Sequence, residues 1–286
     1  MVEKNVQDGT LRIEGAELYY EVRGSGPALV MIAGAGGDAG FYEGAAEELA
    51  DAFTVITYDR RGNSRSTGRV DKPMSMAEQA DDARAVIDAL AGGKAIVYGS
   101  SLGGLIALEL AARHPDALTA LIVHEPPAVN VLADREEPRA FLQSIHATYS
   151  AEGPEAAGMK FALSFPGEGT YHWPDPLMER FGGNVDFLFQ QEWNSIIEYQ
   201  PNLDALKESP FPIVMSAGSA DRGYYFARPS AVIAREIGAE WVEFPGIHME
   251  GVARPAMLAA AIRVVATGLY ARATQSIPDQ WSGMKG

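Results

Sequence analysis

The chain has 286 residues, no cysteine and a formal net charge of −15, and 47% of its residues are hydrophobic. This length and apolar content suffice for one large buried core, and the negative charge disfavours nucleic acid and anionic membrane surfaces as partners. Without cysteine there is no disulfide, thiolate metal site or catalytic thiol. The N-terminus lacks a basic region followed by an apolar one, and no apolar run reaches the roughly 18 residues of a membrane span. We therefore expect a cytoplasmic protein that binds neither membrane nor nucleic acid.

Short β-branched runs alternate with longer helical patterns in the first half of the chain and again near its end. This rhythm predicts an α/β fold with a mostly parallel sheet and helices on both faces. Two short segments before it predict an antiparallel lead-in. In chain order the expected elements are strands 11–13, 17–22 and 29–33, helix 40–49, strand 54–58, helix 76–90, strand 95–98, helix 102–113, strands 118–123 and 213–215, helix 230–237, strand 241–244 and helix 253–270.

The alternation stops between Pro126 and about Ser209, where helical patterns rich in aromatic residues take over. We interpret this as an insertion, so that residues 1–125 and 210–286 form the core domain and residues 126–209 form a helical cap over the carboxyl edge of the sheet. Most of the rings are expected to pack inside the cap. Their abundance also indicates an apolar substrate of small to medium size.

The segment Gly99-Ser100-Ser101-Leu102-Gly103 matches G-x-S-x-G between a predicted strand and a predicted helix. In such a nucleophile elbow the serine takes strained backbone angles, and small residues two positions away on either side let the strand and the helix approach closely. Only Ser101 has glycine at both positions. Ser101 is therefore the predicted nucleophile and Ser100 a small spacer; the alternative is a glycine-rich helix start with Ser101 as its N-cap.

A serine hydroxyl needs a neighbouring base, and the base needs an orienting acid. His248 follows the last predicted strand in FPGIHMEG and is the predicted base, with His124 at the end of strand 118–123 as the alternative. Asp221 lies after strand 213–215 and gives the chain order serine, acid, histidine, so it is the predicted acid. Glu125, directly after strand 118–123, is the alternative acid.

Acyl transfer also needs backbone N–H groups aimed at the developing oxyanion. One predicted donor is Leu102, the residue after the nucleophile. The second is expected from the glycine-rich loop after strand 29–33, with Ala35 preferred and Gly36 in reserve. Water then resolves the acyl-enzyme, so this reading needs no metal and no cofactor.

The elbow GSSLGG, the loop AGAGGDAGF, the segment YDRRGNSRS and the ending PGIHMEG make the chain resemble the α/β-hydrolase superfamily, in particular its cap-bearing esterases and lactonases. The resemblance implies an eight-stranded, mostly parallel sheet with a lid over the active site. The family's loop commonly reads His-Gly, whereas Ala33 stands at that position here. Ser101 disfavours the dehalogenases and epoxide hydrolases of this fold, which use aspartate. Esterase, lactonase, carbon-carbon hydrolase and cofactor-free perhydrolase or haloperoxidase-like activities stay open.

Two other classes of function compete with a hydrolase. Gly34-x-Gly36-x-x-Ala39, with Asp59 twenty residues further on, also matches a dinucleotide fingerprint and would make the chain an NAD(P)-binding protein. A ligand-binding protein built on the hydrolase fold would carry the same motifs. The neighbouring arginines Arg60 and Arg61 are expected to form structural ion pairs rather than to bind an anionic substrate. The partner is expected to be a small molecule, and a homo-oligomer stays open.

Overall fold

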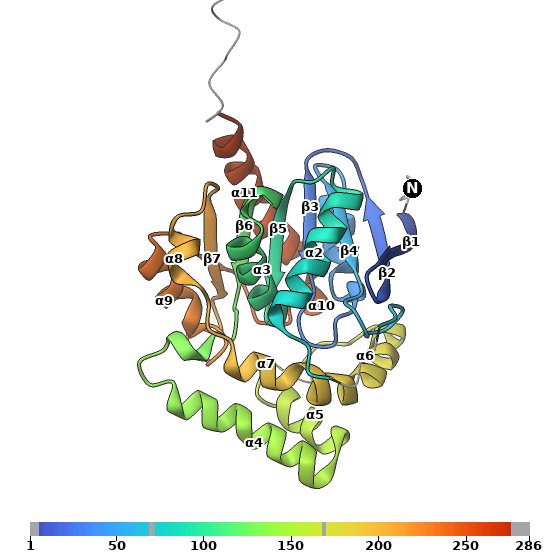
Figure 1. Ribbon diagram of the computed structural model, residues 1–286, viewed down its shortest axis with the longest axis vertical. Helices are drawn as coiled ribbons and strands as arrows, with labels where there is room; N and C mark the ends of the chain where they lie inside the picture. The colour runs from blue at the N-terminus through green and yellow to red at the C-terminus, as the bar shows by residue number, and fades with distance from the viewer. Residues whose placement is uncertain (1–5, 69–71, 168–169, 276–286) are drawn as a thin grey trace, which may run out of the picture.

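The computed structural model describes residues 6–68, 72–167 and 170–275. Within them one eight-stranded sheet contains β1 (Val6–Ile13), β2 (Ala16–Arg23), β3 (Ala28–Ile32), β4 (Thr54–Tyr58), β5 (Ala95–Ser100), β6 (Leu118–His124), β7 (Ile213–Gly218) and β8 (Glu240–Phe244). The spatial order is β1-β2-β4-β3-β5-β6-β7-β8 (Figure 1). β2 pairs antiparallel with β1 and β4, whereas the other neighbours pair in parallel. The predicted lead-in and the mostly parallel sheet are confirmed.

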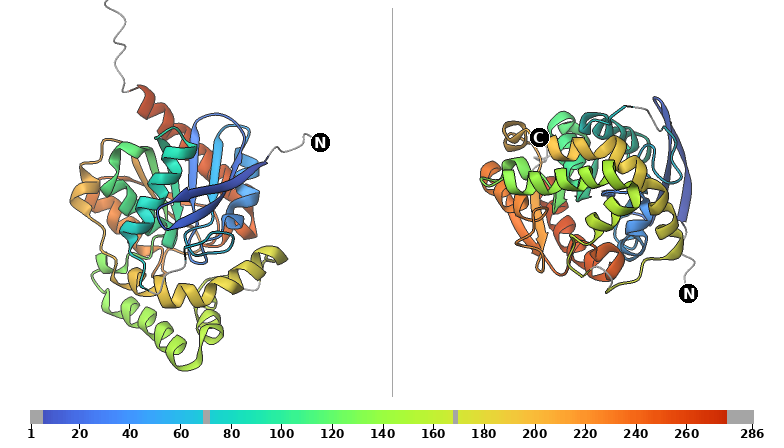
Figure 2. Two further views of the ribbon diagram at one scale, coloured as in Figure 1. Left: turned by 45° about the vertical axis from the view of Figure 1, so that its right-hand side comes forward. Right: turned by 90° about the horizontal axis from the view of Figure 1, so that it is seen from below.

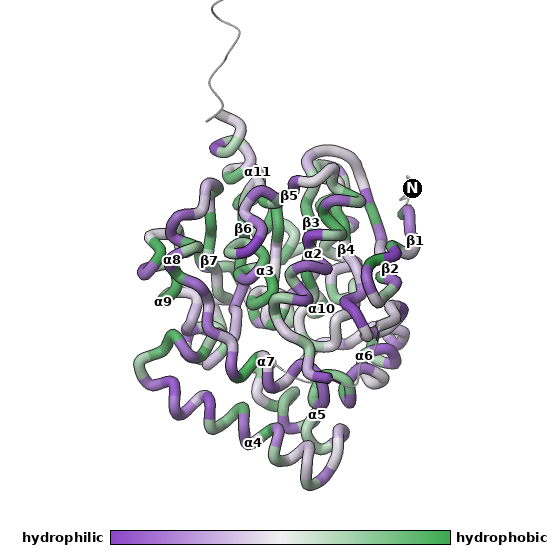
Figure 3. Tube along the Cα trace, viewed as in Figure 1, coloured by the Kyte–Doolittle hydropathy of each residue, from purple (hydrophilic) through white to green (hydrophobic). Residues whose placement is uncertain are grey.

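Helices cover both faces of this sheet, so its central strands are buried from end to end and consist almost entirely of apolar residues (Figure 3). On one face lie α2 (Met76–Leu90), α3 (Leu102–Arg113) and α9 (Arg228–Ile237), packed around Val86, Leu105 and Ile233. On the other lie α1 (Glu43–Leu49) and α11 (Pro255–Gln275), packed around Ala45 and Ile262. Short connecting elements are η1 (Ala39–Tyr42), η2 (Pro115–Ala117) and α10 (Glu250–Ala253).

Between β6 and β7 the chain leaves the sheet and forms a layer of helices below the carboxyl ends of the strands (Figure 2). Its elements are η3 (Val129–Val131), α4 (Glu136–Glu152), α5 (Pro154–Ala162), α6 (Asp175–Phe187), the π-helical turn η4 (Leu188–Glu192), α7 (Trp193–Glu198) and α8 (Leu203–Lys207). This layer falls within the predicted insertion at 126–209. Its treatment as a separate domain stays a prediction, and residues 1–5 and 276–286 of the predicted core domain lie outside the described residues.

The last helix bears on the expected lack of a membrane-spanning segment. Residues Pro255–Thr274 of α11 are long and apolar enough to cross a membrane by length and composition, with a mean hydropathy of 1.3. Alanine and valine supply most of this apolar character. Arg263 and Arg272 interrupt the segment, so it contains no uninterrupted apolar run of 18 residues. One side of α11 packs into the core through Leu258, Ile262 and Leu269. Such packing is also what a core helix of a globular domain needs.

Candidate active site

The strand-turn-helix around Ser101 has the geometry of a nucleophile elbow. Ser101 follows β5 directly, precedes α3 and has φ 56° and ψ −127°, a region that residues with a side chain rarely adopt. A Cβ at Gly99 would lie 2.3 Å from the Gly103 carbonyl oxygen, and one at Gly103 would lie 2.0 Å from the Ile32 carbonyl oxygen. Both glycines are therefore required for the close approach of strand and helix, as the sequence pattern predicted.

His248 lies in the loop between β8 and α10, and its partner differs from the preferred expectation. Its Nδ1 is 2.6 Å from Oε2 of Glu125, whose other oxygen accepts the Gly218 N–H at 2.7 Å. The preference for Asp221 as the histidine's partner is corrected: the alternative acid, Glu125, makes this contact. Burial would raise the pKa of Glu125, but His124, His248 and the Gly218 N–H hold that pKa below its usual value.

Glu125 reaches the histidine because of its unusual backbone. It is the first residue after β6, has a positive φ of 48° and is fully buried. Its N–H donates to the Ser216 carbonyl at 3.0 Å, so the turn stays attached to β7. The carboxylate is thereby directed across the end of β7 toward the His248 loop. The strained angle marks Glu125 as a position held by the surrounding structure.

Asp221 lies beside this pair as a second carboxyl. It is fully buried, and neither of its oxygens accepts a well-aligned N–H or O–H among the described residues. A Cβ at Gly218 would be 3.2 Å from Oδ2 of Asp221 and 3.3 Å from Oε1 of Glu125, so both carboxyls crowd one glycine. Burial, and then the charge of the neighbouring Glu125, raises the pKa of Asp221 to about 8. The raised pKa favours the protonated form of Asp221, because two adjacent buried carboxyls do not readily both ionise.

The predicted oxyanion loop lies against the elbow. Ala35, Ser101 and His248 line one pocket, and a Cβ at Gly34 would be only 2.9 Å from that of Ser101. The loop is a tight turn in which the Gly37 N–H donates to the Gly34 carbonyl at 3.1 Å. Leu102 is the first residue of α3, so its N–H has no acceptor in a preceding helical turn. Ala35 and Leu102 therefore lie beside Ser101. Gly36, the reserve donor, has a φ of +83° and lies against Phe181 of the cap.

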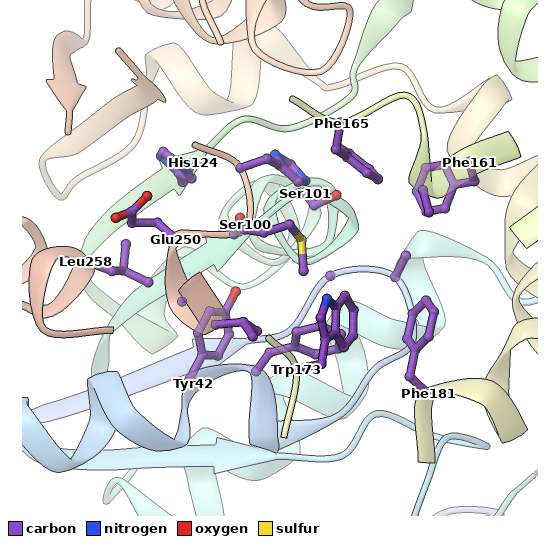
Figure 4. Close-up of a pocket in the computed structure, with 18 of the residues that line it drawn as sticks. Tyr42, Ser100, Ser101, His124, Phe161, Phe165, Trp173, Phe181, Glu250 and Leu258 are labelled. Atoms are coloured by element: carbon purple, nitrogen blue, oxygen red, sulfur yellow. The ribbon is translucent and has the colours of Figure 1, made fainter. Parts of the chain in front are cut away.

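The pocket at Ser101 is a cavity of about 90 Å³ between core and cap (Figure 4). Aromatic rings of the cap form one side, and hydroxyl and imidazole groups of the core lie near the serine. No lysine or arginine is among its lining residues in the described part of the chain. The cap contributes Phe161, Phe165, Trp173 and Phe181, and the core contributes Tyr42, Tyr98, Ser100, His124, Glu250 and Leu258.

Comparisons with known proteins agree with this architecture. A family model described as the alpha/beta hydrolase fold matches residues 27–178. A Bacillus subtilis protein named as an uncharacterized hydrolase, YraK, is 34% identical over 250 residues, which are 85% of this chain and 90% of that protein. The chain belongs to the α/β-hydrolase family. An Azorhizobium caulinodans protein named for carbamate hydrolysis, RutD, is 42% identical to this hydrolase over 108 residues, only 38% of this chain and 40% of that protein.

A solved structure resembles the hydrolase over nearly its whole length. A thermophilic esterase from Thermogutta terrifontis has a TM-score of 0.75 at 22% identity, with 92% of this chain and 99% of that chain covered. The family match and this likeness confirm the predicted α/β-hydrolase fold. At such low identity the structural likeness shows the fold alone.

His124, the alternative base, has a different place in this hydrolase. Burial lowers the pKa of its imidazole to about 4, so the ring is neutral at neutral pH. Its Nδ1 lies 3.0 Å from the Ser216 hydroxyl, and the ring stacks between Tyr98 and Phe244. It lines the pocket beside the Glu125 carboxylate. An imidazole with so low a pKa is a weak base, which favours His248 over His124 as the candidate base.

The two arginines form ion pairs, as expected. Arg61 pairs with Asp82 at 2.6 Å, and Arg60 pairs with Glu192 of η4 in a fully buried contact. Arg60 also donates to the carbonyls of Ala33, at 3.1 Å, and Gly34, at 2.9 Å. Arg60 therefore joins the predicted oxyanion loop to the cap.

Asn184 of α6 makes a second such connection. Its amide donates to the Gly36 carbonyl at 2.8 Å and accepts the Ser64 N–H at 2.9 Å. These cap residues carry no sequence motif. No signal in the sequence could have singled them out, because their partners lie far away in the chain.

Asp59, the acid of the dinucleotide fingerprint, makes its contacts within the protein. Its carboxylate accepts the Ala39 N–H at 2.8 Å and pairs with Arg65 at 2.7 Å, both contacts inside the protein. The loop Gly34–Gly37 itself faces Ser101 and the cap. Within the described residues, no group of three or more His, Asp or Glu side chains is arranged to hold a metal ion.

Proposed function

We propose that this α/β hydrolase is a serine hydrolase that cleaves an ester, lactone or similar acyl bond of a small to medium apolar molecule. The observation that carries the proposal is the strained Ser101 in one pocket with His248, whose far nitrogen is 2.6 Å from the buried Glu125 carboxylate. A serine becomes nucleophilic when such an oriented base takes its proton.

In the proposed mechanism, Ser101 Oγ attacks the acyl carbon while Nε2 of His248 accepts its proton. Glu125 holds the imidazole by its Nδ1–H and stabilises the imidazolium that forms. The N–H groups of Ala35 and Leu102 donate to the oxyanion. Collapse of the intermediate expels the leaving group, which takes the proton from His248. A water molecule then attacks the acyl-enzyme, gives its proton to His248, and Ser101 recovers its proton as the acid product leaves.

The substrate side of the proposal depends on the lining of the pocket. Aromatic rings of the cap and the absence of lysine and arginine among the described lining residues favour an apolar, uncharged molecule. Carbamates belong in the substrate panel because RutD is named for their hydrolysis. Carbon-carbon hydrolysis and cofactor-free perhydrolysis need the same three side chains, so they form the next panel rather than separate mechanisms.

The test is turnover of p-nitrophenyl butyrate together with mass analysis of the rapidly quenched protein. Wild type should give a burst and an acyl adduct on Ser101, and Ser101→Ala should lose about 10⁴-fold or more of kcat. The matched control is Ser100→Ala, which removes the neighbouring hydroxyl but leaves the adduct at Ser101. A folded wild type with no turnover and no adduct on esters, lactones or carbamates would refute acyl chemistry and favour a ligand-binding protein.

A further inference from the structure

One polar group at the pocket has no hydrogen-bond partner among the described residues. The indole N–H of Trp173 is buried, and it donates to no acceptor among the described residues. The ring is held by edge contacts with Phe41, at a centroid distance of 5.3 Å, and by Phe181, at 5.2 Å. Figure 4 shows its nitrogen on the edge of the ring that faces the interior of the pocket. A buried donor without an acceptor costs free energy, so its retention requires an explanation.

The other buried indole of the cap shows what a structural tryptophan looks like here. Trp193 is 1% exposed, and its N–H donates to the Leu142 carbonyl at 3.0 Å. The cap therefore satisfies the indole that serves its own packing. Trp173 differs because its N–H has no such acceptor among the described residues, while its ring lines the cavity of about 90 Å³ at Ser101. An acceptor that enters with the substrate is the simplest partner for it.

The chemistry of the surroundings limits that acceptor. An indole N–H only donates, so the substrate must present an oxygen or nitrogen lone pair. Phe161, Phe165 and Phe181 make the rest of the cap side apolar, and no lysine or arginine among the described lining residues is present to neutralise a carboxylate. The net charge of −15 also opposes anionic substrates. A neutral acceptor on an otherwise apolar arm fits these conditions.

We infer that the substrate is a compact, uncharged ester or lactone with a second oxygen acceptor, an ether or carbonyl, that binds Trp173 Nε1–H. This inference rests on the proposed function, since the scissile carbonyl is taken to lie at Ser101. Trp173 is then a specificity residue: it rejects molecules that leave its N–H unpaired. The oxygen lies on the acyl arm or on the alcohol arm, depending on which arm occupies the aromatic side.

The test compares isosteric pairs that differ only by an oxygen in place of a methylene. For the acyl arm the pair is p-nitrophenyl methoxyacetate and p-nitrophenyl butyrate; for the alcohol arm it is 2-methoxyethyl acetate and butyl acetate. For each pair we divide kcat/KM of the oxygen-containing ester by kcat/KM of its methylene analogue, in wild type and in Trp173→Phe. Comparing the two proteins cancels the intrinsic reactivity of the esters.

In one of the two pairs the ratio should be about 10-fold higher in wild type than in Trp173→Phe, equivalent to about 1.4 kcal/mol. A ring that only packs would change both members of a pair equally. Trp193→Phe is the matched control: it should lower the melting temperature and leave both ratios unchanged. Equal ratios in wild type and Trp173→Phe for both pairs would overturn the inference. If wild type hydrolyses none of these esters, the proposed function is refuted instead.

Discussion

Replacing Glu125 with glutamine would remove one negative charge and keep the shape of the side chain. In the wild type both carboxylate oxygens accept hydrogen bonds, one from the Gly218 N–H at 2.7 Å and one from His248 Nδ1 at 2.6 Å. A glutamine has only one oxygen, and the fixed Gly218 N–H needs an acceptor. The amide NH₂ group then faces His248 and favours the imidazole tautomer with its proton on Nε2, which is unable to accept the proton of Ser101.

The expected cost follows from these two losses. The wrong tautomer and the missing charge beside the imidazolium together lower kcat about 10³- to 10⁴-fold, which is about 4 to 5.5 kcal/mol of transition-state stabilisation. The assay is the steady-state hydrolysis of p-nitrophenyl butyrate across pH 5 to 9, with unfolding curves to show that the variant is folded. KM should change little, because Glu125 is fully buried and does not line the pocket.

Asp221→Asn is the matched control, since it changes the second carboxyl and keeps the His248–Glu125 contact. Its loss of kcat should be at least 10-fold smaller than that of Glu125→Gln. Glu125→Gln removes the charge that, after burial, raises the pKa of Asp221, so the pKa of Asp221 should fall in this variant. A 10³-fold loss in Asp221→Asn with near-normal activity in Glu125→Gln would show that Asp221 orients the base, and the geometric reasoning above would be wrong.

Two further predictions concern stability. The Asp221 pKa is about 8 in the folded protein and 3.8 in the reference state, so between these values the folded state retains a proton that the unfolded state has lost. The stability of wild type relative to Asp221→Asn should therefore fall, by at least about 1 kcal/mol, as pH rises from 4 to 8; urea unfolding at pH 5, 7 and 8.5 checks this, and a pH-independent difference contradicts it. Arg60→Met should cost about 3 to 5 kcal/mol because it leaves Glu192 buried without its cation, whereas adding Glu192→Met should restore much of this stability. Activity of the double variant should stay reduced, since the Ala33 and Gly34 carbonyls lose their donor; equal unfolding midpoints for the single and double variants would refute the pairing argument.

The sequence by itself predicted the elbow at Ser101 and the loop that carries His248, because the signals for both are local. The elbow needs glycines two residues from Ser101 on either side, within one strand and one helix, and the clashes that a Cβ would cause at Gly99 and Gly103 confirm why. His248 was found in the same way, from a loop that follows the last strand. The alternation of strands and helices likewise predicted the sheet, since the period of apolar residues is set by the element itself.

Only the tertiary structure decided the partner of the histidine. Glu125 and Asp221 follow the neighbouring strands β6 and β7, so their positions along the chain do not distinguish them. The positive φ of Glu125 and the Gly218 N–H direct its carboxylate to His248, and these features depend on packing between strands.

The same holds for the cap. Trp173, Asn184 and Glu192 contact residues of the core domain that are distant in the sequence. The hydrogen bond from Asn184 to the Gly36 carbonyl, for example, spans 148 residues. Their neighbours in the chain carry no information about such contacts, because the partner is chosen by how the cap packs on the sheet.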